Sequence, residues 1–210
     1  METRIKINLD EVMSCGEPVV LELGCGTRKT PGRIGVDCVD LPEVDIVADL
    51  EAGLDFMPDN SVDEIHAEHV LEHLENFEGM MREICRVLKA SGTCRVRVPH
   101  FTNPYAYSDY THKRVFGLYT FHYFVDEAHQ LRRKVPSHYT DVRIRILSQR
   151  LIFRSPFKLG NMGRKLFGRM INCCTWMQEH YEANPWHVPC HAIEVIFAPV
   201  KPGAGGELSL

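Results

Sequence analysis

The stretch from Val19 to Lys29 constrains the fold of this chain most strongly. It joins an apolar run to a turn that holds Gly24 and Gly26. The apolar run is typical of a buried strand, and glycines let a backbone turn sharply and approach a ligand closely. Glu22 stands two residues before the first glycine, where its carboxylate can accept hydrogen bonds from an amine or a hydroxyl and repels a phosphate. The stretch therefore favours a nucleoside that carries an amine over a pyrophosphate.

Two further strand-like runs follow, residues 33–37 and 44–50, and each carries an acid near its carboxyl end. Only about ten residues separate the first two runs, so the crossover helix must be short or replaced by a loop. Ligands of open parallel sheets bind outside the carboxyl ends of the strands. We therefore expect Glu22, Asp37 and Asp49 to converge on one crevice. Asp37 can accept from both hydroxyls of a ribose, and Asp49 from an exocyclic adenine amine.

The next fifty residues alternate between strand and helix patterns. Residues 62–67 are expected to form a fourth strand, and residues 68–74 a helical segment. Apolar residues then recur at spacings of three and four over 77–88, which predicts an amphipathic helix ended by Ser91-Gly92. Residues 93–99 form the fifth predicted strand. This alternation predicts an α/β fold with a doubly wound, mostly parallel sheet.

The length of 210 residues suits one domain with a sizeable core, which we place at residues 1–200, with 201–210 as a flexible tail. No apolar run approaches the roughly 20 residues that span a bilayer. The charged N-terminus does not resemble a signal peptide. Eight cysteines without a Cys-x-x-Cys pair indicate reduced thiols. A cytoplasmic location is the expectation.

Six short motifs follow one another between residues 21 and 93. They are Leu-Glu-Leu-Gly-Cys-Gly, Gly-Val-Asp, Ala-Asp-Leu, Pro-Asp-Asn-Ser-Val-Asp-Glu-Ile, Glu-His-Val-Leu-Glu-His-Leu and Arg-Val-Leu-Lys-Ala-Ser-Gly-Thr. In this order they resemble the class I S-adenosylmethionine-dependent methyltransferases, particularly the small-molecule (type 11) group. The resemblance implies a Rossmann-like fold with an antiparallel last strand, S-adenosylmethionine as cofactor, and methyl transfer to an oxygen or nitrogen of a small molecule.

The resemblance also implies a set of cofactor-binding residues. These are Glu22, Gly24, Cys25, Gly26, Lys29, Asp37, Asp49, Leu50, His66 and Glu68. Glu22 and the two glycines would hold the methionine part, Asp37 the ribose, and Asp49 with Leu50 the adenine. The end of the fourth strand would lie beneath the methyl group. The first loop is shorter than in many relatives, and Lys29 could pair with the cofactor's carboxylate. Because a third glycine and room for a helix are missing, a nucleotide-binding oxidoreductase is disfavoured.

Residues 99–135 are expected to form an aromatic-rich cap over the crevice, because they follow directly from the fifth strand. Most of its aromatics would pack the core, whereas its polar groups are functional candidates. The run from Asp109 to Arg114 is similar to the Asp-Pro-Thr-His-x-Arg run of bacterial members of the group. His112, oriented by Asp109, is a candidate base, as is His100. The candidate substrate-binding residues are Tyr105, Tyr107, Lys113 and Arg114.

The last third of the chain is expected to hold a short helix at 126–134, a strand at 142–147, a long helix at 160–181 and a last strand at 191–197. Basic residues gather within residues 131–170. They are Arg132, Arg133, Lys134, Arg143, Arg145, Arg150, Arg154, Lys158, Arg164, Lys165 and Arg169. This cluster is either a solvated surface or a site for an anionic substrate, a partner protein or a membrane headgroup.

Several alternatives remain open at this point. A non-catalytic protein of the same fold could bind S-adenosylmethionine or dock a partner. Nucleic-acid modification would use the basic cluster, although the net charge of −4 weighs against it. The histidines at 66–73 and 187–191 raise a metal hypothesis, but the sequence fixes no acidic third ligand, so no metal is predicted. The chain could be a monomer or a homodimer.

Overall fold

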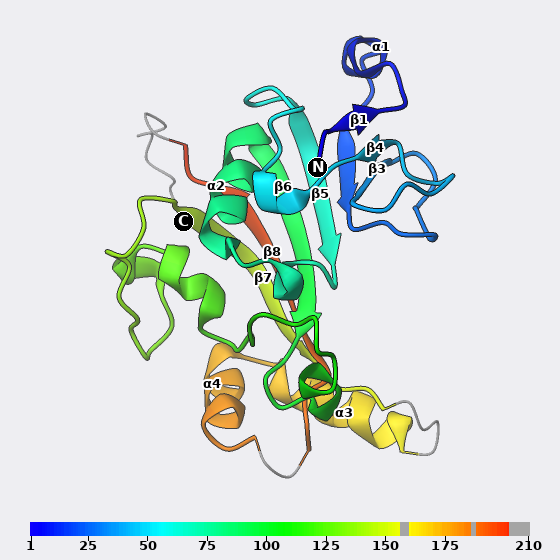
Figure 1. The fold of residues 1–210 in the computed structure, drawn as a ribbon. Helices are drawn as coiled ribbons and strands as arrows, with labels where there is room; N and C mark the ends of the chain where they lie inside the picture. Colours follow the sequence, from blue (N-terminus) through cyan, green and yellow to red (C-terminus); the bar gives the residue numbers. More distant parts are fainter. Residues whose placement is uncertain (156–159, 186–187, 202–210) are drawn as a thin grey trace.

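The computed structural model describes residues 1–155, 160–185 and 188–201, which build one eight-stranded sheet of order β1-β4-β3-β2-β5-β6-β8-β7 (Figure 1). The strands are β1 (Arg4–Ile5), β2 (Val20–Leu23), β3 (Ile34–Asp37), β4 (Ile46–Val47), β5 (Val62–Glu68), β6 (Leu88–Pro99), β7 (Ile144–Ile152) and β8 (Ala192–Pro199). Neighbours among β2 to β6 pair in parallel. β8 pairs antiparallel with β6 and β7. The predicted α/β fold, with its antiparallel last strand beside the fifth predicted strand, is confirmed.

The helices are shorter than the sequence pattern predicts. They are α1 (Leu9–Ser14), α2 (Phe77–Val87), α3 (Asn161–Ile171) and α4 (Thr175–Ala183), with 3-10 helices at Leu50–Ala52, Leu71–His73, Pro104–Tyr107, Thr120–Phe124 and Glu127–His129. The long helix predicted for 160–181 is two helices. The Asn172 amide accepts from the Leu151 N–H and donates to the Leu151 carbonyl, so it ties the end of α3 to β7.

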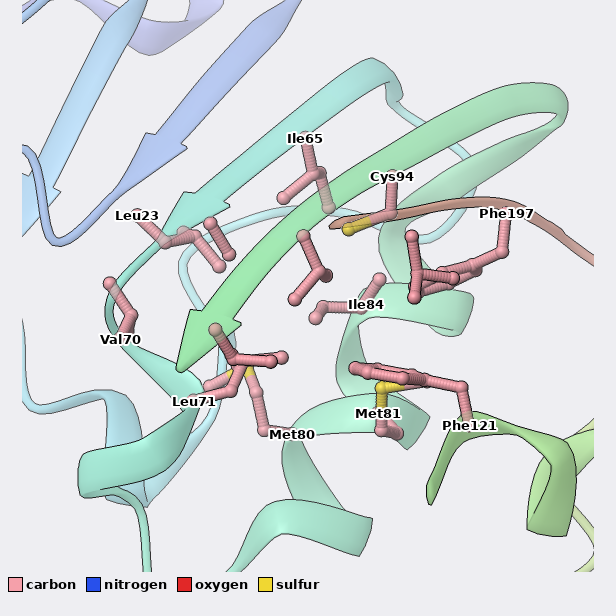
Figure 2. Close-up of a cluster of buried hydrophobic side chains, with 14 of the residues drawn as sticks. Leu23, Ile65, Val70, Leu71, Met80, Met81, Ile84, Cys94, Phe121 and Phe197 are labelled. Carbon is pink, nitrogen blue, oxygen red and sulfur yellow. The ribbon is translucent and has the colours of Figure 1, made fainter. Parts of the chain in front are cut away.

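α2 covers one face of the sheet and holds the core against it. Its cap is Asn76, whose side chain accepts from the Gly79 N–H. Its buried residues, among them Met80, Met81 and Ile84, meet the buried side chains of the sheet (Figure 2). The helix ends at Val87 and β6 begins at once, so the predicted stop at Ser91-Gly92 falls within the strand. The periodic pattern thus places the helix correctly and misses only its end.

The opposite face of the sheet is charged. Two rows of side chains cross it: Glu22, His66 and Arg95 in one, and Glu68, Arg97, Glu194 and Arg150 in the other. No helix occurs in residues 24–45, between β2 and β4, all of which the structure describes. Parallel sheets are ordinarily covered on both faces by their crossover helices. The short loops predicted there leave this face without such a cover, which accounts for its polar side chains.

α3 and α4 lie beyond the carboxyl ends of β5 and β6, while α1 lies at the opposite end of the molecule (Figure 1). Lys201, at the start of the predicted tail, donates from Nζ to the Cys85 carbonyl at 2.6 Å. The rest of the predicted tail, 202–210, lies outside the described residues. Within those residues, none of the helices has the length and apolar character needed to cross a bilayer.

His122 is expected to make the fold sensitive to acid. Gln149 donates its amide N–H to the Leu118 carbonyl, so its oxygen accepts from His122 Nε2 at 3.0 Å. His122 Nδ1 is buried with no partner among the described residues, and burial lowers the pKa of this imidazole. A lowered folded-state pKa means that the unfolded chain binds more protons below about pH 6.5. The free energy of unfolding should therefore fall as the pH drops below 6.5. Urea titrations across this range should show that the free energy of unfolding falls less steeply with decreasing pH for His122→Gln than for the parent. Equal slopes for the two proteins would contradict the assignment to His122.

Candidate functional site

The glycine turn lies at the carboxyl end of β2 and is fastened to β3. Gly24 and Gly26 have φ of +65° and +51°, a backbone region that side chains with a Cβ seldom adopt. The Gly24 N–H donates to the Val36 carbonyl at 2.7 Å. Asp37 Oδ2 accepts from the Gly26 N–H, and its Oδ1 accepts from the Val39 N–H, each at 2.9 Å. The turn and the acid at the end of β3 therefore form one rigid unit.

A hollow of about 340 Å³ opens beside this unit, and we call it the carboxyl-end hollow. It is lined by Gly24, Asp37, Cys38, Asp49, Leu50, Glu51, His69, Val70, His73 and Leu74. Four predicted cofactor residues meet here: Gly24, Asp37, Asp49 and Leu50. Asp49 also caps a 3-10 helix, because its Oδ1 accepts from the Glu51 N–H at 3.0 Å. Of the three acids expected to converge on one crevice, Asp37 and Asp49 line this hollow, whereas Glu22 does not.

A second hollow of about 630 Å³, here the sheet-face hollow, lies on the charged face. It is lined by Glu22, Leu23, Gly24, Cys25, Arg28, Thr30, Arg33, His66, Ala67, Glu68, His69, Arg95 and Arg97. Four predicted cofactor residues, namely Glu22, Cys25, His66 and Glu68, lie in this hollow and do not line the first one. Gly24 and His69 line both. The two hollows therefore meet at these two residues.

The charges around the turn are largely paired within the protein. Glu22 Oε2 accepts from the Thr30 N–H at 2.9 Å. Lys29 Nζ, expected near the cofactor's carboxylate, donates instead to both oxygens of Asp45, at 2.9 and 2.8 Å. Arg28 lines the sheet-face hollow, and no carboxylate within residues 1–155, 160–185 and 188–201 pairs with it. Arg28, and not Lys29, is thus the cation available at this turn.

Two titratable groups of the sheet-face hollow are held neutral. Burial, together with the nearby Asp37 and Glu22 carboxylates, raises the pKa of the Cys25 thiol to about 11. Burial also lowers the pKa of His66, helped by the positive charge of Arg33, although Glu64 acts in the opposite direction. Neither group carries a charge of its own at neutral pH. The electrostatics of the hollow are therefore set by its arginines and glutamates.

His69 was not among the predicted cofactor residues. It has φ of +57°, an uncommon conformation for a residue with a Cβ, at the point where both hollows meet. Its Nδ1 lies 3.1 Å from Glu72 Oε1. Its position directly after Glu68, within the Glu-His-Val-Leu-Glu-His-Leu motif, was the available signal. Cys38, Val70 and His73 of the first hollow were also missed.

The two candidate bases have different surroundings. His112 Nδ1 lies 2.8 Å from the Ala106 carbonyl, which can only accept, so Nδ1 carries the proton and Nε2 keeps its lone pair. Nε2 lies 3.6 Å from Asp109 Oδ2. His100 is fully buried, and its two nitrogens contact Glu182 at 2.9 Å and Thr102 at 2.8 Å. His112 is therefore placed to accept a proton, whereas His100 joins the segment after β6 to α4.

The four candidate substrate residues are dispersed. Tyr107 donates to the Phe101 carbonyl, and Tyr105 lines a separate hollow of about 200 Å³. Lys113 pairs with Glu75 at 3.2 Å. Arg114 donates to the Leu74 and Glu75 carbonyls. The structure does not bring these four residues together at either hollow described above.

A basic hollow of about 800 Å³ adjoins the sheet-face hollow through Arg95 and Arg97. Its basic lining residues are Arg95, Arg97, Arg150, Arg154, Lys165 and Arg169. Glu194 is the single acid of the lining in the part of the chain that the structure describes, and it accepts from Arg97 at 2.6 Å and Arg95 at 2.9 Å. Part of the predicted basic cluster of residues 131–170 thus gathers around one concave surface. Lys158 of that cluster lies outside the described residues.

Comparison with known proteins finds one family model that matches part of this chain and solved structures with a similar fold. Residues 21–96 match a family model described as a methyltransferase domain. The structure is similar to that of a SAM-dependent methyltransferase from Archaeoglobus fulgidus, with a TM-score of 0.50, 18% sequence identity, and coverage of 88% of this chain and 87% of that one. It is also similar to the YcgJ protein from Bacillus subtilis, with a TM-score of 0.50, 16% identity, and coverage of 93% and 98%.

At these identities the solved structures establish the fold, and a search of curated proteins finds no match. The family match spans β2 to β6 and includes the glycine turn, Asp37 and Asp49. S-adenosylmethionine is the cofactor of this family. Over the site-bearing strands this chain therefore matches a methyltransferase domain, on a fold that it shares with a solved SAM-dependent methyltransferase.

Proposed function

We propose that S-adenosylmethionine lies across Gly24, with its adenosyl part in the carboxyl-end hollow and its amino-acid end in the sheet-face hollow. The lining residues fit the two ends. Each Asp37 oxygen accepts one backbone N–H and keeps a second lone pair for a ribose hydroxyl. Asp49 offers a carboxylate for the adenine amine, and Leu50 an apolar contact. Glu22 and Arg28 carry the opposite charges that an ammonium and a carboxylate require.

This placement would put the methyl group near His69 and Glu68, where the two hollows meet. The cofactor supplies an electrophilic methyl on a sulfonium. The protein supplies orientation, which for two groups held in line can account for much of the rate. His112, with its free Nε2 lone pair and Asp109 beside it, is the group proposed to take a proton from an acceptor oxygen or nitrogen.

The acceptor is proposed to be an anionic small molecule. The observation that supports this choice is the basic hollow, which continues from the sheet-face hollow through Arg95 and Arg97. Arg150, Arg154 and Lys165 have no carboxylate partner among the residues of the described ranges. Clefts lined by charge of one sign raise the local concentration of oppositely charged ligands. An acceptor that carries a carboxylate or phosphate would complement this surface.

The proposal can be tested with methyl-labelled S-adenosylmethionine and a small-molecule cell extract separated by anion exchange. We expect label in the retained, anionic products. At low extract concentration, Arg150→Gln should reduce transfer by about tenfold, because a charge-assisted hydrogen bond contributes about 1.5–3 kcal/mol. Arg145→Gln is the matched control: it changes the same charge on the same strand, β7, outside the hollow. It should change transfer by less than about twofold on the same scale.

Label in unretained products only, or equal losses in the two variants, would contradict an anionic acceptor. Label in the RNA or DNA of an unfractionated extract, lost as salt is raised, would instead assign a nucleic-acid acceptor. Binding of S-adenosylmethionine without transfer to any fraction would favour the non-catalytic alternative. Each outcome leads to a different class of function for the same fold.

A further inference from the structure

We propose that Glu72, His73 and His112 form a binding site for a divalent transition-metal ion beside the carboxyl-end hollow. One potential ligand atom from each of the three lies within 4.8 Å of the other two. Glu72 and His73 belong to the segment after β5, whereas His112 belongs to the cap after β6. The Lys113 N–H donates to the Glu72 carbonyl at 2.8 Å and holds the two segments together. The role of the ion in methyl transfer rests on the proposed function. Binding of the ion does not.

Hydrogen bonds around the cluster define its chemistry. Thr111 Oγ1 donates to Asp109 Oδ1 at 2.5 Å, so its lone pair accepts from His73 Nδ1 at 3.0 Å. His73 Nδ1 therefore carries the proton, and Nε2 of this ring keeps its lone pair. The same holds for His112, whose Nδ1 donates to the Ala106 carbonyl. Metal-ligating histidines have this arrangement, with one nitrogen fixed by a hydrogen bond and the other free to bind the ion.

The burial of the Glu72 carboxylate independently supports the site. Its side chain is 1% exposed, and its Oε1 lies 3.1 Å from His69 Nδ1. Its Oε2 is buried and has no hydrogen-bond partner in the described ranges 1–155, 160–185 and 188–201. A buried carboxylate oxygen without a donor is costly. A cation among the three groups would supply its missing partner.

The donor set indicates the type of ion. Two imidazole nitrogens and one carboxylate oxygen suit zinc, cobalt, nickel or iron(II) better than magnesium or calcium, which prefer oxygen ligands. Ligand atoms of a tetrahedral zinc ion lie about 3.4 Å apart, so the three groups would have to approach by up to about 1.4 Å. Asp109 lies beside His112 and could serve as a further ligand.

Such an ion would lie close to the proposed methyl position, because Glu72 Oε1 lies 3.1 Å from Nδ1 of His69, the residue at which the two hollows meet. A divalent ion lowers the pKa of a hydroxyl bound to it. The bound ion, and not the lone pair of His112, would then promote deprotonation of an acceptor oxygen. This would make methyl transfer dependent on the metal, whereas S-adenosylmethionine binding through Asp37 would not be.

The test uses the full chain without a histidine tag, freed of metal by a chelator and titrated with Co²⁺. We expect one Co²⁺ per chain, with visible d–d bands that Zn²⁺ abolishes by competition. Glu72→Gln, His73→Asn and His112→Asn should each weaken binding by about tenfold or more. His129→Asn is the matched control, since His129 is an exposed histidine outside the cluster. This variant should bind Co²⁺ with the same affinity as the parent.

Glu72→Gln keeps the size of the buried side chain, and circular dichroism of each variant reports whether it folds. Absence of cobalt bands at millimolar Co²⁺, or a loss of affinity in His129→Asn equal to that in the cluster variants, would overturn the metal site. Charge-transfer bands typical of thiolate ligands would assign the ion to cysteines instead and would also overturn it. If the parent bound Co²⁺ but not S-adenosylmethionine, the metal site would stand and the proposed function would fail.

Discussion

Gly24→Ala should destabilise the protein by about 3 kcal/mol or more, from backbone strain of about 1–2 kcal/mol together with overpacking of about 1–3 kcal/mol. A Cβ at this position would lie 2.2 Å from Val70 Cγ2, and φ is +65°. Gly26→Ala is the matched control, because its φ of +51° carries similar strain, but no atom of the described residues, its two chain neighbours aside, lies within 4 Å of the added Cβ. We expect it to lose only about 1–2 kcal/mol.

Urea unfolding of the two variants measures this difference directly. The double variant Gly24→Ala/Val70→Ala removes the methyl that the new Cβ would meet, so it should recover the part of the loss due to the clash. Equal destabilisation by Gly24→Ala and Gly26→Ala would show that only backbone strain matters at the turn. A Gly24→Ala chain that remains folded should also bind S-adenosylmethionine more weakly, because Gly24 lines both hollows.

Those features of the site that depend on local pattern were predictable from the sequence. Asp37 and Asp49 each follow a short apolar run, and parallel strands bring their carboxyl ends to one edge. The polar face was not predicted, although its signal is present, since Arg95 and Arg97 alternate with buried residues along the fifth predicted strand. A strand buried on both faces would lack that alternation. The short loops before β3 and β4 explain why this face is uncovered.

Features that depend on pairing between distant residues were not predictable. Lys29 is bound by Asp45, sixteen residues along the chain, so its charge is not available to a cofactor. His100 is buried against Glu182, eighty-two residues away. Because several acids could have partnered either residue, the sequence offers no way to choose among them. The proximity of His112 to Glu72 likewise depends on the path of the cap, which no periodicity specifies.

Asp37→Asn should weaken binding of S-adenosylmethionine by about tenfold to a hundredfold, which corresponds to about 1.5–3 kcal/mol for a hydrogen bond to a charged group. The carboxylate has two tasks, since it accepts from the Gly26 and Val39 N–H groups and is proposed to accept from the ribose. An amide retains one acceptor oxygen and turns a donor towards the other partner. Calorimetry with S-adenosylmethionine measures the loss.

Asp40→Asn is the matched control, because Asp40 is exposed, lies three residues away and pairs with Lys6 outside both hollows. It should leave the affinity unchanged while altering the net charge equally. Urea unfolding separates the two tasks of Asp37, since the backbone contacts affect stability whether or not cofactor is present. If Asp37→Asn were destabilised yet bound S-adenosylmethionine within about threefold of the parent, a difference of less than about 0.7 kcal/mol, the carboxylate would serve the turn alone. The ribose would then need another partner, and Asp49 is the other predicted carboxylate in the same hollow.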